Sequence, residues 1–213
     1  MSRTIIFANG HLPDLAAVRT LIRADDILLA ADGGTRRALA LGLIPSVVIG
    51  DLDSISREER QKMEEAGVRL IQHPRDKNET DLELALQFAI EQNHREIVIV
   101  AALGDRLDQT LANIALLTDL RLSTFDLKLD DGVEEAFFCR DRAEVRGRGG
   151  DLVSLIPWGG AATGVRTDGL KWPLSGETLF PEKTRGISNE MLGATAHIEI
   201  ASGLLLVIHR RQS

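Results

Sequence analysis

Several acidic side chains follow short apolar runs of the chain or, in one case, open a helical segment. They come from distant stretches of the sequence: Asp32, Asp51, Asp53, Asp81 and Asp108. Single acids of this kind are common as turn residues and helix caps. If the apolar runs are neighbouring parallel strands, however, the acids converge on one edge of the sheet, where open α/β sheets bind their ligands. The set therefore predicts one shared site.

The chemistry of such a set is that of a divalent cation. Carboxylates that lie close together repel one another, and a bound cation removes the conflict. Hard oxygen ligands without histidine or cysteine favour Mg²⁺, and the five histidines of the chain have no metal-ligand spacing. Asp51 and Asp53 are two residues apart, so in an extended segment both side chains would point the same way and reach one ion.

Basic residues that could face phosphate lie beside these acids. Lys77 precedes an expected helix start at Thr80, where backbone N–H groups favour anions, and Arg106 lies in the same short segment as Asp108. Each basic residue taken alone is more often a solvated surface charge. The chain contains neither a Gly-x-x-x-x-Gly-Lys-Ser/Thr phosphate loop nor the protein-kinase motif set.

The elements that must position these residues follow two different rhythms. The first 130 residues alternate apolar runs with helical patterns, which predicts βαβ units and a mainly parallel sheet. The expected strands are Thr4–Ala8, Ile27–Ala31, Ser46–Ile49, Arg69–Ile71, Ile97–Ala101 and Phe125–Leu129, and the clearest helices are Thr80–Gln92 and Asp108–Leu120.

From about residue 131 onward, short strand patterns are separated by turn-rich pieces without a long helical pattern. The expected strands are Glu135–Cys139, Asp151–Ile156, Gly164–Thr167, Ala194–Ile200 and Leu204–His209. This half is typical of an antiparallel β-sandwich. We therefore expect an α/β catalytic domain at residues 1–130 and an all-β sandwich domain at residues 131–213.

Composition narrows the class of protein. The 213 residues are 44% hydrophobic and 27% charged, which is ordinary for a globular protein, and the net charge of −7 argues against a nucleic-acid partner. No run approaches the roughly 20 apolar residues that span a bilayer, so no membrane partner is expected. The single cysteine, Cys139, suits a reducing cytosol. We expect a cytoplasmic protein.

Six short motifs, in this order and spacing, resemble those of the thiamine pyrophosphokinase family. They are Ala31–Gly34, Pro45–Ser54, Lys77–Ala85, Gly104–Asn113, Asp168–Leu174 and Gly186–Glu190. Each motif is weak alone, but the ordered set covers nearly the whole chain. The resemblance implies an α/β catalytic domain followed by a β-sandwich, and a homodimer with thiamine sites at the subunit interface.

Matched residue by residue, the resemblance also implies roles for individual side chains. Mg²⁺ would be held against the triphosphate of ATP by Asp51, Asp53 and Asp81. The nucleotide site would be lined by Asp32, Gly33, Lys77, Thr80, Arg106 and Asp108, and thiamine would be contacted by Ser188 and Asn189.

The implied reaction is attack of the thiamine hydroxyl on the β-phosphorus of ATP, with AMP as the leaving group. Such transfers need positioning and neutralisation of charge more than covalent catalysis. The expected catalytic residues are Asp51, Asp53, Asp81 and Asp108, and the sequence leaves open whether Asp81 or Asp108 accepts the hydroxyl proton. Two positions depart from the family pattern. Where this chain has Asn78 the family often has Asp, and where it has Gln109 many bacterial members have His. Gln109 cannot act as a titrating base.

Two alternatives remain at this point. A pyrophosphokinase for another alcohol, such as a hydroxymethyl pterin, would use a similar acidic site. A non-catalytic nucleotide sensor would need no metal-binding cluster, so the converging acids weigh against it. The Ser188-Asn189 motif and the β-rich second half favour thiamine.

Overall fold

The computed structural model describes residues 3–104 and 106–212. The chain divides into two compact units, Met1–Gly132 and Val133–Ser213. Asp105, within the Gly104–Asn113 motif, lies outside the described residues. No helix among the described residues is long and apolar enough to cross a membrane.

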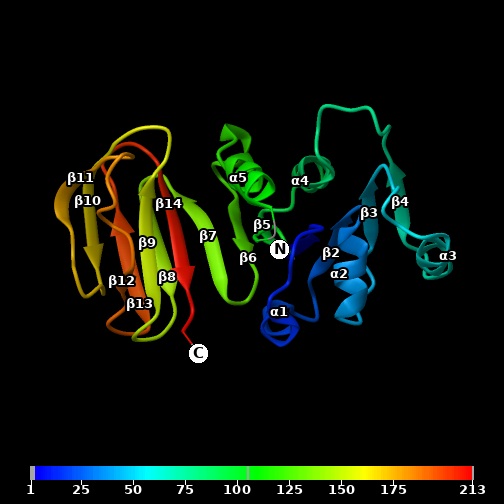
Figure 1. The fold of residues 1–213 in the computed structure, drawn as a ribbon, viewed down its shortest axis with the longest axis horizontal. Coiled ribbons are helices and arrows are strands. Elements are labelled where there is room, and N and C mark those ends of the chain that lie inside the picture. The colour runs from blue at the N-terminus through cyan, green and yellow to red at the C-terminus, as the bar shows by residue number, and fades with distance from the viewer. Residues whose placement is uncertain (1–2, 105, 213) are drawn as a thin grey trace. The chain divides into compact units, whose positions relative to one another are not determined.

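The strands of the first unit are parallel and lie in the order β6-β5-β1-β2-β3-β4 (Figure 1). Their bounds are Thr4–Phe7 for β1, Ile27–Ala31 for β2, Val47–Gly50 for β3, Arg69–Gln72 for β4, Glu96–Val100 for β5 and Asp126–Asp130 for β6. The side chains of β1 are fully buried, as are most of those of β5. Strands buried on both faces are expected of a parallel sheet, so the predicted α/β architecture is confirmed.

Helices connect these strands. Their bounds are Leu15–Leu21 for α1, Gly34–Ala40 for α2, Arg57–Glu65 for α3, Asp81–Glu91 for α4 and Leu107–Leu116 for α5, with a 3₁₀ turn at Leu120–Leu122. The helix α4 starts as the sequence predicts, because the Thr80 hydroxyl accepts the N–H of Glu83 at 3.2 Å. The helix expected to run to Leu120 ends earlier, because Asp119 accepts the N–H of Arg121 and starts the 3₁₀ turn.

The second unit is built from antiparallel strands in two layers (Figure 1). One has the order β12-β9-β14-β7 and the other β11-β10-β13-β8. The bounds are Glu134–Cys139 for β7, Arg142–Arg146 for β8, Leu152–Pro157 for β9, Ala162–Asp168 for β10, Ser175–Leu179 for β11, Asn189–Glu190 for β12, Thr195–Glu199 for β13 and Leu205–Arg210 for β14. Side chains of both layers, among them Leu155, Val207, Val145 and Ile198, form one buried core. The predicted sandwich is therefore confirmed.

Three strands of this unit, β8, β11 and β12, were not predicted from the sequence. In β8 the inward-facing Ala143 and Val145 alternate with charged residues, so the strand carries little apolar signal. The edge strand β11 exposes most of its polar residues, and β12 has two residues. Such strands are held by pairing with their neighbours more than by their own apolar pattern.

Candidate functional site

A glycine at the end of β3 allows three segments of the first unit to meet. A Cβ atom built on Gly50 would lie 2.8 Å from the Cβ of Asp32 and 3.0 Å from the Cγ of Asp81. Such contacts are shorter than real side chains tolerate, so glycine is required for this approach. The residue after β2 and the first residue of α4 are thereby brought to the end of β3, as the strand-end argument predicts.

Strained backbone lies at the same strand ends. Asp32 follows β2 with φ of 41°, Leu52 follows β3 with φ of 63°, and Ala101 follows β5 with φ of 56°. Each left-handed, non-glycine residue costs of the order of 1–3 kcal/mol and persists only where the surroundings hold it. Three such residues after three parallel strands indicate that this sheet edge is shaped for binding rather than for stability.

The predicted acids converge here. Asp32, Asp51 and Asp53 have carboxylate oxygens within 4.8 Å of one another. Asp32 is only 5% exposed, and its Oδ1 atom has no hydrogen-bond donor among the described residues. Burial raises the pKa of the Asp32 carboxyl, and the charges of Asp81 and Asp51 act in the same direction, against hydrogen bonds from Ser54 and the Gly33 backbone. The negative charge of Asp32 is therefore poorly compensated by the protein.

The geometry of Asp51 and Asp53 differs from the expectation. The segment is not extended, because Leu52 between them is left-handed. Instead a tight turn brings the two acids together: the backbone N–H of Asp53 donates to Oδ1 of Asp51 at 3.1 Å. Leu52 itself is buried, which anchors this turn in the core of the first unit.

Lys77 lies in the loop before α4, and its side chain contacts Asp81 and Asp51. Its Nζ lies 3.0 Å from Oδ1 of Asp81 and 3.9 Å from Oδ2 of Asp51, and its side chain is 12% exposed. Burial by itself would lower the pKa of Lys77, but the hydrogen bond to Asp81 and the surrounding carboxylate charges outweigh burial and raise it. Lys77 is therefore a firmly charged cation inside an acidic site.

A cavity of about 480 Å³ opens beside these residues. It takes in all the predicted nucleotide-contacting residues other than Asp108. Its lining includes Asp32, Gly33, Asp53, Lys77, Thr80, Asp81 and Arg106. A cavity of this size, with acids at one side and basic residues and a helix N-terminus nearby, suits a phosphorylated ligand with a metal ion.

Some lining residues were not assigned a role by the sequence analysis: Asn9, Ser54, Glu79 and Asn113. Asn9 lies two residues after β1, so the strand-end rule would have found it had it been applied to amides as well as acids. The side chain of Asn9 packs against Gly33. Asn113 donates to the backbone carbonyl of Ala102 at 2.8 Å and so braces the strained turn after β5. No sequence pattern points to that bond.

Arg106 and Asp108 form an ion pair on the outside of the site. Their closest atoms are 2.5 Å apart, and each side chain is about two-thirds exposed (68% and 66%). The hydrogen bond from Arg106 lowers the pKa of the Asp108 carboxyl. Arg106 lines the cavity, whereas Asp108 is outside the residues that line it. Asp108 is thus placed to hold Arg106.

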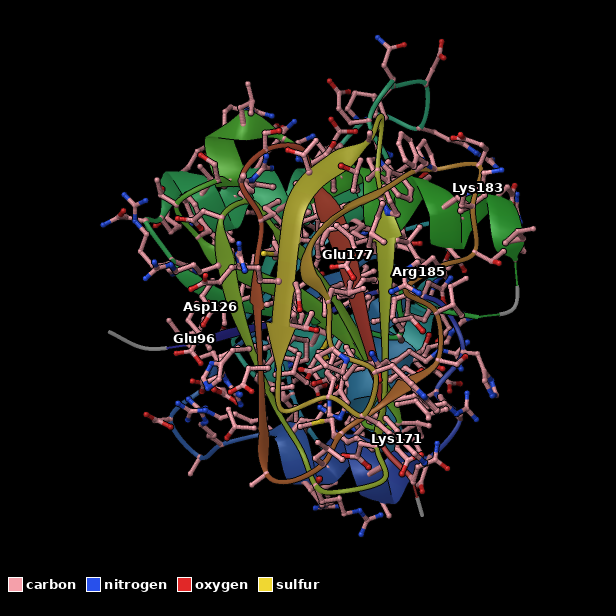
Figure 2. All side chains as sticks on the ribbon, turned by 90° about the vertical axis from the view of Figure 1, so that its left-hand side faces the viewer. Glu96, Asp126, Lys171, Glu177, Lys183 and Arg185 are labelled. Atoms are coloured by element: carbon pink, nitrogen blue, oxygen red, sulfur yellow. The ribbon has the colours of Figure 1, made fainter. Side chains whose placement is uncertain are left out.

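The second unit has a cavity of its own, of about 400 Å³. It is lined by Leu155, Trp172, Leu174, Thr184, Arg185, Gly186, Ile187 and Asn189. Trp172 and Ile187 are 57% and 48% exposed, so their apolar surfaces are open to a ligand. Figure 2 shows Arg185 close to Glu177 on this unit, where their side chains form an ion pair of 3.4 Å.

Asn189 serves as a clamp in this unit. Its amide oxygen accepts the N–H of Trp172 at 3.1 Å and that of Glu190 at 2.9 Å, and its amide nitrogen donates to the carbonyl of Trp172 at 2.7 Å. The side chain is 7% exposed. Ser188 is left-handed, with φ of 56°, and its backbone N–H donates to the hydroxyl of Ser154. Asn189 lines the cavity and fixes the Trp172 backbone, whereas Ser188 lies next to Asn189 and outside the residues that line the cavity.

Comparison with known proteins gives this geometry a context. The family model described as "Thiamin pyrophosphokinase, catalytic domain" matches residues 18–129, and the one described as "Thiamin pyrophosphokinase, vitamin B1 binding domain" matches residues 142–205. The chain belongs to the thiamine pyrophosphokinase family. The predicted family is thereby confirmed.

Individual relatives agree with the family. The thiamine pyrophosphokinase of Bacillus subtilis is 30% identical over 84% of this chain and 85% of its own length. Thiamine pyrophosphokinase 1 of rice is 27% identical over 97% of this chain and 87% of its own length. These matches support the thiamine diphosphokinase prediction over the pterin enzyme and the nucleotide sensor. Thiamine as acceptor and ATP as co-substrate follow from the family.

Solved structures of the family share the fold. The crystal structure of the Bacillus subtilis thiamine pyrophosphokinase matches with a TM-score of 0.88 and 26% identity, covering 100% of both chains. The yeast enzyme matches with a TM-score of 0.77 at 18% identity, over 98% of this chain and 86% of that one, and this match concerns the fold alone. The predicted combination of a mainly parallel α/β unit and an all-β unit is confirmed.

Proposed function

We propose that this chain transfers the pyrophosphoryl group of ATP to the hydroxyl of thiamine at the acidic cavity of the first unit, giving thiamine diphosphate and AMP. The observation that carries the site assignment is the buried carboxylate of Asp32. It lies at the end of β2 with an unsatisfied oxygen, beside Asp51 and Asp53. A protein gains nothing in stability from such a group, so the group is there for a ligand.

The donor set of this cavity fits Mg²⁺. The acidic cluster at the cavity offers carboxylate oxygens, which are the ligands of hard cations. The residues that would hold the ion are Asp51, Asp53 and Asp81, with Asp32 close enough to join them. When bound, Mg²⁺ would polarise the phosphate oxygens and neutralise charge that develops on them. The assignment to Mg²⁺ rests on this donor chemistry.

The remaining cavity residues would hold the phosphates. Lys77 and Arg106 are the cations of the lining, and Thr80 caps α4, whose first N–H groups favour an anion. Gly33, between β2 and α2, allows close approach of the backbone. These residues would place the β-phosphorus in line with the attacking hydroxyl, which is most of what such a transfer requires.

The proton of the thiamine hydroxyl has two candidate acceptors among the predicted residues. Asp108 is bound by Arg106, which lowers its pKa, so it is a weak base and its proposed role is to position Arg106. Asp81 lines the cavity, and its ion-pair partner among the described residues is Lys77, whose side chain is flexible. We therefore favour Asp81 as the acceptor, in addition to its role at the metal.

The second unit would bind thiamine. The exposed indole of Trp172 offers a flat apolar surface to an aromatic ring, and Asn189 holds it in place. Ser188 lies next to this clamp. Substitution of Asn189 by alanine would act on thiamine affinity through Trp172.

We further propose a cytoplasmic homodimer in which Ser188 and Asn189 of one chain complete the site of Asp51 and Asp53 of the other. This proposal is supported by the motifs in both halves of the chain, which resemble those of the thiamine pyrophosphokinase family. Light scattering of the purified chain at assay concentration should give twice the chain mass, and a monomer that is fully active would refute the shared site.

The direct test of the function is product analysis. With ATP, Mg²⁺ and thiamine, ³¹P NMR should show AMP and thiamine diphosphate in equal amounts, and EDTA should abolish both. A hydroxymethyl pterin offered in place of thiamine should give no AMP. Release of ADP together with thiamine monophosphate would contradict pyrophosphoryl transfer, and AMP release with the pterin alone would favour the other alcohol.

A further inference from the structure

The ammonium group of Lys77 lies where a cation between the acids would lie. Its Nζ is 3.0 Å from Asp81 and 3.9 Å from Asp51, and the side chains of these acids are only 26% and 15% exposed. Lys77 itself is 12% exposed. The ion pairs are thus largely shielded from water, so that screening by solvent is weak and the positive charge of Lys77 acts strongly on its neighbours.

A second basic residue of the same loop provides a contrast. Arg75 lies 3.3 Å from Asp53, but its side chain is 84% exposed. Exposed ion pairs of this kind are screened and contribute little. The two residues carry the same charge next to the same acidic cluster and differ mainly in burial.

We propose that Lys77 is the internal counter-ion of the metal site and weakens the binding of a divalent cation until the nucleotide arrives. This rests on the proposed function. The ammonium competes with a divalent cation for the lone pairs of the Asp81 carboxylate, and its positive charge repels a cation beside it. A triphosphate removes both obstacles, because its oxygens offer Lys77 another partner.

The position of Lys77 permits the exchange. It lines the nucleotide cavity as well as touching the acids, and a lysine carries its charge on a flexible four-carbon stem. The ammonium can therefore turn from Asp81 to a phosphate oxygen without movement of α4. Binding of metal and nucleotide is coupled by this single side chain.

Lys77 nevertheless does not neutralise the whole acidic cluster. Asp32 is 5% exposed, and its Oδ1 has no hydrogen-bond donor among the described residues. Lys77 contacts Asp81 and Asp51, and Arg75 contacts Asp53. Among the described residues, neither Lys77 nor Arg75 forms an ion pair with Asp32. The positive charge of Lys77 is thus close enough to Asp81 and Asp51 to compete with a metal ion, but it does not neutralise all the acids of the cluster.

Mn²⁺ titration of the nucleotide-free protein tests this, with free Mn²⁺ read from its EPR signal. Lys77→Met should bind Mn²⁺ about tenfold or more tighter than the wild type, because one shielded like charge is removed. Arg75→Met, the matched control, should change the affinity by less than about twofold. Lys77→Arg keeps the charge and should stay as weak as the wild type. Equal affinity of Lys77→Met and wild type, or an equal gain in Arg75→Met, would overturn the proposal.

A measurement on the wild type covers the case in which the variants fold poorly. Without nucleotide, saturating Mg²⁺ should displace Lys77 and raise its acetylation by acetic anhydride, followed by mass spectrometry. Unchanged acetylation would refute the exchange. Neither readout depends on turnover, so failure of AMP production would reject the function and leave the counter-ion role standing. Normal AMP production with no effect on Mn²⁺ binding would reject the counter-ion role alone.

Discussion

The two units of this chain each bury carboxylates, and they treat them in opposite ways. In the second unit, His209 is completely buried between two acids: Nδ1 lies 2.9 Å from Glu135 and Nε2 lies 3.1 Å from Asp151. Asp151 also accepts the backbone N–H groups of Arg148 and Gln212. In the first unit, Asp32 is buried with an oxygen that has no donor among the described residues.

The difference distinguishes a structural buried acid, whose charge is compensated within the protein, from one that is suited to bind a ligand. Both ring nitrogens of His209 face carboxylates, so the imidazole can donate a hydrogen bond to each acid only when it carries both protons and a positive charge. Burial works against that charge, but hydrogen bonds to Glu135 and Asp151 outweigh it and raise the pKa of His209. The cluster ties β7 and β14 to the turn before β9 and needs nothing from outside. The acids around Asp32 are left incomplete for a ligand.

The largest expected effect on stability belongs to the satisfied cluster. His209→Gln would remove the buried cation between Glu135 and Asp151, and breaking a buried ion pair typically costs about 3 kcal/mol or more of unfolding free energy. Urea unfolding at pH 6 measures the loss. Activity per folded molecule should stay near the wild-type value, because the cluster lies in no cavity proposed for a substrate. A loss of unfolding free energy below about 1 kcal/mol would contradict the structural role of the His209 cluster.

The pH dependence of that loss has a definite sign. A histidine whose folded-state pKa is raised above its ordinary value of about 6.5 stabilises the fold fully below that pH, and the contribution is lost as pH rises through the raised value. The gap between wild type and His209→Gln should therefore narrow from pH 6 to pH 9. Asp151, whose pKa is lowered, remains charged over this range. Two further charged groups face the cluster: Arg148 lies 3.7 Å from Asp151, and Arg211 lies 3.5 Å from Glu135.

A smaller effect on stability, of opposite sign, is expected in the first unit. Asp32→Asn removes a desolvated charge, and asparagine tolerates the left-handed backbone at this position. Because the pKa of Asp32 is raised, its ionised form weakens the nucleotide-free fold above the ordinary pKa of about 3.9. The variant should be equally stable or more stable at pH 7 in urea unfolding, yet at least 10-fold less active. Lower stability with unchanged kcat would make Asp32 a structural acid.

The sequence alone predicted the fold class and the convergence of the acids, because both follow from strand–helix alternation and from the rule that strand ends form the site. It did not predict which backbone features bring the acids close together. Gly50 admits Asp32 and Asp81 to the end of β3, and Leu52 turns Asp51 toward Asp53. Such features depend on distances between segments that are far apart in the chain, which spacing does not encode.

The same limit applied to single side chains. Lys77 was predicted to face phosphate, but its ion pairs with Asp81 and Asp51 emerged only from the folded loop. Asn189 was predicted to contact thiamine, and the structure shows its amide binding the Trp172 backbone. His209 gave no signal in the sequence, since its two acid partners come from other strands and turns.

One matched pair of substitutions tests the central claim most directly: Asp53→Asn in the first unit and Asp151→Asn in the second. Kcat for AMP formation and the unfolding free energy would be measured on the same preparations. Asp53→Asn should lose at least 10–100-fold in kcat, as expected at a metal site, without loss of stability. Asp151→Asn should lose about 2 kcal/mol of stability, because buried donors lose their acceptor, and keep its kcat per folded molecule. The account would be contradicted if Asp53→Asn kept near-normal turnover, whether or not its stability were lowered.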